Sequence, residues 1–128
     1  CNGADISPPL KFEDIPDGTS TLALIVDDPD APAGTFVHWV VWNINPTTME
    51  IPENSVPAEA AEGTTDFNKT GWGGPCPPDK EHRYYFKLYA LDTELKLPET
   101  TTKKDLETAM EKHILAKAEL MGRYDQPR

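Results

Sequence analysis

Basic residues are scarce in this chain of 128 residues. Lys and Arg together number 12, whereas Asp and Glu number 22, which gives a formal net charge of −10. A protein that binds duplex nucleic acid needs a basic face to neutralise phosphates, and adhesion to anionic lipid headgroups needs a basic cluster. The charge balance therefore argues against nucleic acid as a partner and against polybasic attachment to a membrane.

Long apolar runs and cysteines are scarce too. No run of about 18 apolar residues occurs, so no integral membrane contact is predicted. The only cysteines are Cys1 and Cys76, too few for a disulfide framework. Reduced thiols in a cytoplasmic protein are the favoured interpretation. A periplasmic or secreted location, the segment before Cys1 and a Cys1–Cys76 pairing all stay open.

Proline is abundant instead: there are 13, and eleven of them precede residue 79. This predicts a loop-rich first two-thirds with short strands, within a single domain spanning 1–128. Strands are predicted for three apolar segments rich in β-branched and aromatic residues, Thr21–Asp27, Phe36–Ile44 and Arg83–Leu91. Alternation along the second strand would place His38 on one face with Val40, Trp42 and Ile44.

The C-terminal stretch changes to a helical period. Thr102 can cap a helix, with Asp105 three residues further on. Apolar residues then recur every three or four positions, at Leu106, Met110, Ile114, Ala118 and Met121. Gly122 fits the end of a helix. The pattern predicts one C-terminal α-helix of about 18 residues that packs on a β core.

Three polar features stand out from this predicted core. Asp27-Asp28-Pro29-Asp30-Ala31-Pro32 follows an apolar strand, His38 lies inside another, and Gly71–Pro78 forms a Gly/Pro-rich loop before His82 and Tyr84. Each has a plain structural interpretation: a rigid acidic turn, a core histidine and a loop shaped by its backbone. Together they offer imidazoles, a phenol, a carboxylate and backbone N–H donors, which suit a small anionic or zwitterionic headgroup.

Metal binding and covalent catalysis have weaker support. His38, His82 and Asp28 could form a two-histidine, one-carboxylate metal site, but no tight ligand spacing favours it. Cys76 lacks the surroundings of a cysteine hydrolase, and His113 is interpreted as structural. We therefore predict no metal, no cofactor and no catalytic residue.

The motifs together resemble the phosphatidylethanolamine-binding protein family, more narrowly its bacterial and archaeal branch of Raf kinase inhibitor-like proteins. The segments that carry the resemblance are Cys1-Asn2-Gly3, Asp5–Leu10, Ala23–Pro32, His38-Trp39, Gly73–Pro78 and His82-Arg83-Tyr84. The similarity runs from Cys1 to about Tyr124. Two departures are a missing N-terminal strand and the charged step Asp79-Lys80-Glu81 before His82.

The resemblance implies a mainly β fold: an antiparallel, Greek-key β-sandwich with small peripheral helices and an anion pocket at one end. The pocket positions that carry over are Asp28, His38, Gly74, Pro75, His82 and Tyr84, with Asp30 and Pro32 in a supporting loop. Family members bind phosphate-like groups and phospholipid headgroups. Kinase regulation is not carried over, because no matching residue set supports it.

The favoured hypothesis is a non-enzymatic protein that binds a small anion or phospho-headgroup. One alternative is a protease- or kinase-inhibiting module acting through a surface loop within Pro46–Thr65, for which a target protein would be the partner. Another is a hydrolase that uses His38 and Asp28 as acid and base. A homodimer is left open.

Overall fold

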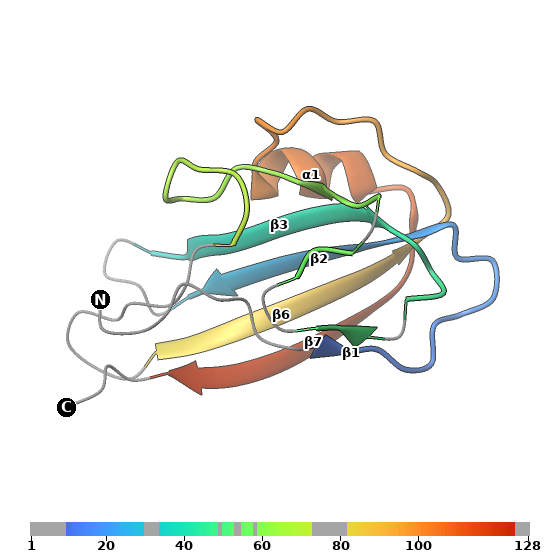
Figure 1. Ribbon diagram of the computed structural model, residues 1–128, viewed down its shortest axis with the longest axis horizontal. Coiled ribbons are helices and arrows are strands. Elements are labelled where there is room, and N and C mark those ends of the chain that lie inside the picture. Colours follow the sequence, from blue (N-terminus) through green and yellow to red (C-terminus); the bar gives the residue numbers. More distant parts are fainter. Residues whose placement is uncertain are drawn as a thin grey trace.

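The main sheet of the molecule has five antiparallel strands in the order β5-β3-β2-β6-β7 (Figure 1). These strands are β2 (Thr21–Asp28), β3 (Phe36–Ile44), β5 (Ala61–Glu62), β6 (His82–Leu91) and β7 (Ile114–Tyr124). A second sheet pairs β1 (Leu10–Lys11) with β4 (Glu50–Ile51). The predicted mainly β, antiparallel fold is confirmed, and so are its three long strands.

These elements come from a computed structural model. It describes residues 10–29, 34–48, 50–52, 55–57, 59–72 and 82–124, without the side chains of residue 82 and residues 121–124. Both cysteines, Asp30, Pro32, Gly74 and Pro75 lie outside these residues. No helix in the described part of the chain is long and apolar enough to cross a bilayer.

The centre of the main sheet, formed by β2 and β3, is buried on both faces, which explains why β2 is apolar over most of its length. One face, here called the helix face, packs against the helix α1 (Lys103–Met110) and carries Ala23, Ile25, Val40, Trp42 and Leu91. The opposite face, here called the site face, packs against β1 and β4 and carries Leu22, Leu24, Val26, Trp39 and Val41. Both faces of β2 are withdrawn from water, as in other doubly covered sheets.

The helix starts as predicted but ends early. Thr102 and Asp105 form a reciprocal capping box, and Leu106 and Met110 are buried. Beyond Met110 the prediction was wrong, because residues 114–124 form strand β7 and pair with β6 along its whole length. Ile114 and Ala118, expected in a buried stripe, are exposed. Residues 114–124 form cross-strand hydrogen bonds with the edge of β6, and this pairing prevails over the helical spacing of their apolar side chains.

Candidate functional site

A β-bulge sets the direction of His38. Between β2 and β3, Val26 pairs with Trp39 whereas Asp27 pairs with Val37, so His38 is an extra residue without a partner position on β2. A bulge breaks the regular alternation of side chains. The prediction that His38 shares a face with Val40 and Trp42 was therefore wrong.

The bulge turns His38 towards the site face, among aromatic rings. The centroid of its imidazole lies 5.2 Å from those of Phe36 and Tyr84 and 5.5 Å from that of Phe67. The Trp72 indole is 6.3 Å away. His38 is 4% exposed. An imidazole thus lies in a water-poor cage of rings, where its hydrogen bonds gain strength.

Asp28 and Tyr84 join His38 on this face. Asp28 ends β2, pairs with Phe36 of β3 and is 3% exposed. Tyr84 lies on β6 and is 5% exposed. Strand alternation places Asp28 with Val26 and Tyr84 with Phe86, both of which pack on the site face. The structure therefore brings together three of the predicted residues from three adjacent strands.

The other predicted residues are described only in part. His82 begins β6, two residues before Tyr84, but its side chain lies outside the description. Gly74, Pro75, Asp30 and Pro32 also lie outside it. Within the described residues, no group of three or more His, Cys, Asp or Glu side chains could hold a metal ion.

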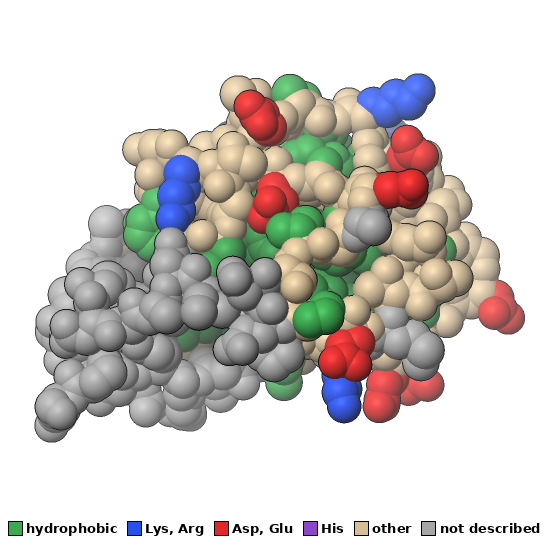
Figure 2. Space-filling model, viewed as in Figure 1, with side chains coloured by type: hydrophobic (Ala, Val, Ile, Leu, Met, Phe, Trp, Pro, Cys, Tyr) green, Lys and Arg blue, Asp and Glu red, His purple; other side chains and the backbone are tan. Residues whose placement is uncertain are grey.

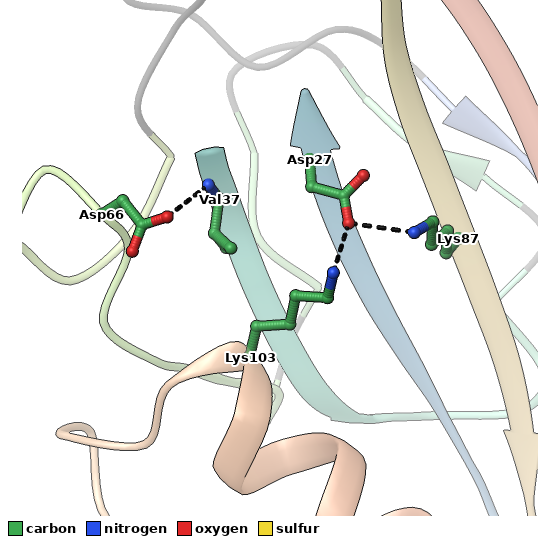
Figure 3. Close-up of polar contacts among 5 residues, drawn as sticks. All are labelled: Asp27, Val37, Asp66, Lys87 and Lys103. Atoms are coloured by element: carbon green, nitrogen blue, oxygen red, sulfur yellow. Dashed lines mark hydrogen bonds and ion pairs between the residues drawn. The ribbon is translucent and has the colours of Figure 1, made fainter. Parts of the chain in front are cut away.

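Asp27 belongs to the opposite face and not to an acidic loop around the site. Its Oδ2 accepts from the ammonium groups of Lys87, at 3.0 Å, and Lys103, at 2.8 Å (Figure 3). Lys103 is the first residue of α1, so this carboxylate ties the helix to the sheet. Asp27 and Asp28 thus face opposite ways, and the two lysines offset the charge of Asp27.

A short loop brings Phe67 to the site. Thr64 and Thr70 form an isolated antiparallel bridge at its base. Asp66 clamps the loop to the start of β3, because its carboxylate accepts from the Val37 N–H at 2.8 Å (Figure 3) and its own N–H donates to the Val37 carbonyl at 3.1 Å. The clamp holds the Phe67 ring 4.7 Å from that of Phe36. Sequence reasoning missed Phe67, which lies 29 positions beyond His38 in the chain.

Trp72 closes the inner side of the cage. Its ring meets Trp39 edge-on at 5.6 Å and stacks on Phe86 at 6.5 Å. The Trp39 indole N–H donates to Glu62 at 2.7 Å. The Trp72 Nε1 atom is buried and, among the described residues, has no hydrogen-bond partner. A buried donor left in this way can serve a bound water or a ligand oxygen.

Comparisons with known proteins agree with the fold. A family model described as phosphatidylethanolamine-binding protein matches residues 1–125. A UPF0098 protein of Pyrococcus horikoshii is 48% identical, over 98% of this chain and 68% of its own length. The UPF0098 protein of Chlamydia muridarum is 49% identical, over 98% of this chain and 87% of its own length.

Solved structures show the same architecture. A Chlamydia trachomatis protein described as a homologue of phosphatidylethanolamine-binding protein is 44% identical and superposes with a TM-score of 0.94, over 99% of this chain and 86% of that one. The E. coli protein YbcL, described as a member of the mammalian family, is 33% identical with a TM-score of 0.91, over 99% and 84%. The family model and these relatives show that the chain belongs to the phosphatidylethanolamine-binding protein family.

Proposed function

We propose that this protein is a non-enzymatic binding protein whose site around His38 takes a small anion, either free phosphate or the phosphate of a headgroup. The observation that carries the proposal is the β-bulge. It removes His38 from the regular core pattern and turns it, buried, towards Tyr84, on the face that also carries Asp28. A histidine that only fills space would not need this departure from regular pairing.

The chemistry of the site supports an anion. An imidazole and a phenol can each donate a hydrogen bond to a phosphate oxygen. The Trp72 indole N–H is a further buried donor. Surrounding rings keep water away, which strengthens hydrogen bonds to a charged ligand. Asp28 can hold an imidazole in its donor tautomer or meet an ammonium group.

Binding without turnover fits the ring contacts of His38, because Phe36, Phe67 and Trp72 carry no nucleophile for covalent catalysis. The net charge of −10 opposes anion capture at long range. We therefore expect weak affinity for free phosphate, in the millimolar range, and stronger binding when an ammonium group accompanies the phosphate.

A titration followed by NMR tests the proposal. Phosphate and O-phosphoethanolamine are added at constant ionic strength while the imidazole signals are recorded. His113 provides an internal control, because it lies between α1 and β7 and contacts Asp92 at 2.8 Å, away from the site. We expect the His38 signals to shift and saturate while those of His113 stay in place.

Two results would contradict the proposal. One is that the His38 signals do not move at millimolar ligand. The other is that the signals of His38 and His113 move in parallel without saturation, which indicates a general effect of salt. His38→Ala should abolish saturable binding in calorimetry, and saturable binding that survives this substitution would also overturn the assignment.

A further inference from the structure

Strand β7 forms one margin of the main sheet. It runs for eleven residues without a proline and pairs with β6 on one side, and no strand of the described residues lies on its other side (Figure 1). All its side chains from residue 114 to residue 120 are exposed, and that of Leu120 is 62% exposed. A long edge strand of this kind presents backbone N–H and C=O groups with which another strand can pair.

The two faces of β7 differ in chemistry. Its even-numbered residues share the site face, because their partners on β6 pack against the core on that face. They are Ala116, Ala118 and Leu120. Lys117 and Glu119 alternate with them and point to the helix face. The strand is thus apolar on one face and carries one charge of each sign on the other.

The charges of Lys117 and Glu119 are unpaired within the described part of the chain. No ion pair or hydrogen bond joins either side chain to another residue. Lys87 lies opposite Glu119 on β6, but its ammonium group contacts Asp27 at 3.0 Å. Both exposed charges therefore stay available for contacts with another molecule.

We infer that β7 pairs with β7 of a second copy of this chain, antiparallel about a two-fold axis through Ala118. This register places Lys117 of each copy opposite Glu119 of the other, so that two ion pairs form on the helix face. On the site face it places Leu120 opposite the small side chain of Ala116. Opposite charges and apolar residues in directly opposed positions stabilise antiparallel strands. One surface serves both copies, as a two-fold interface requires.

The overall charge makes such a local match necessary. Two copies that each carry −10 repel one another, and acidic side chains are spread over the face shown in Figure 2. A lysine on an edge strand commonly keeps other strands away, but the glutamate two positions further on reverses that effect here. Because one pair of strands buries little area, we expect a weak dimer. The inference does not depend on the proposed anion site.

Charge reversal tests this pairing. Sedimentation equilibrium on the full chain measures the dissociation constant of the dimer. Lys117→Glu and Glu119→Lys should each raise it about ten-fold or more, because like charges then oppose each other in both cross-strand pairs. The double variant should restore it to within about two-fold, since the two charges are merely exchanged. An equimolar mixture of the two single variants should form a heterodimer.

Lys104→Glu is the matched control for Lys117→Glu. Lys104 is exposed on α1, so its substitution changes the net charge equally without altering β7. It should change the dissociation constant less than about two-fold. Glu119→Lys lowers the net negative charge, so general repulsion alone would predict tighter association for that variant.

Four results would overturn the inference. They are a monomeric unchanged protein up to about 1 mM, an assembly larger than a dimer, an equal loss in Lys104→Glu, and a double variant that stays monomeric.

Hydrogen exchange on the unchanged protein offers a second test should the variants fold poorly. The β7 N–H groups that point away from β6 should exchange more slowly as the protein concentration rises, because pairing with a second copy protects them. The N–H groups of β5, at the other margin of the sheet, should show no such change. Equal exchange rates in β7 at low and high concentration would contradict the inference without any variant.

Discussion

Asp27 and Asp28 are neighbours in sequence, both are buried, and they face opposite sides of one sheet. Asp27, at 1% exposure, meets two lysines and fastens α1 to the sheet. Asp28, at 3% exposure, ends β2 beside the aromatic cage of His38. The comparison separates a carboxylate that ties the helix to the sheet from one that lies on the face of the proposed site.

The same division extends over the whole sheet. The helix face is closed by α1 and by a chain of close backbone contacts, such as those of Gly63 with Val40 and of Thr64 with Thr101. On the site face, the side chains near the ends of β2 and β3 are held by contacts between aromatic rings and by the β-bulge at His38. A substitution on the helix face should therefore change stability, and one on the site face should change binding.

The largest effect is expected for Asp27→Asn. It leaves two ammonium groups without their shared counter-charge, and because both side chains still reach solvent we expect a loss of about 3 kcal/mol in unfolding free energy. Affinity for O-phosphoethanolamine should change less than about two-fold. Urea denaturation and calorimetry provide the two measurements.

Asp28→Asn is the matched partner of that variant. It should cost less than about 1 kcal/mol of stability and weaken ligand binding about ten-fold or more, because a charged hydrogen-bond partner is lost. If the two variants lose stability and affinity in equal measure, the division between the two faces does not hold.

Gly63→Ala should have the next largest effect. A Cβ at this position would collide with the Thr101 carbonyl oxygen and lie 2.8 Å from Cζ3 of Trp42. Since a backbone atom cannot move aside cheaply, we expect a loss of about 2 kcal/mol on thermal or urea unfolding. Gly18→Ala, where nothing lies within 4 Å but φ is +87°, separates crowding from backbone strain. A smaller cost at Gly63 than at Gly18 would contradict this packing argument.

Val40 and His38 lie on the same strand, β3, and their side chains point to opposite faces of the sheet. Val40 is fully buried in the helix-face core, so Val40→Ala should lower stability by about 1.5 kcal/mol through the lost methyl groups. Its affinity for phosphate should stay within about two-fold. His38→Ala should lose binding altogether at similar or smaller cost in stability. Urea unfolding measures the stability of both variants and calorimetry measures their binding. Together they show whether Val40 contributes to stability and His38 to binding.

The smallest effect concerns Tyr89, which packs against the helix-face core. Its pKa is raised above the ordinary 10.0, chiefly because burial disfavours the phenolate and also because Glu107 is nearby. The resulting stability is fully present below pH 10 and is lost as the pH rises through the higher folded-state pKa. Tyrosinate absorbance should include a late-ionising component that is lost in Tyr89→Phe. The same titration curve in both proteins would contradict this.

Local signals in the sequence were enough for much of the fold. Apolar β-branched runs specified β2, β3 and β6, and the capping box specified the start of α1, because these depend on neighbours within a few residues. The motifs around Asp28, His38 and Tyr84 picked out residues that the structure places on one face of the sheet. The β7 strand was missed, because its pairing with β6 is a long-range contact that no helical or strand period reveals.

The sequence by itself determined the strand segments, the acidic charge and the residue types that an anion site needs. Only the tertiary structure decided where these side chains point. The bulge at His38 depends on the register between β2 and β3, the opposite roles of Asp27 and Asp28 depend on what covers each face, and Phe67 reaches His38 through the Asp66–Val37 clamp. Side-chain direction follows from pairing between distant segments, and a change of one residue in register sends a side chain to the other face of the sheet.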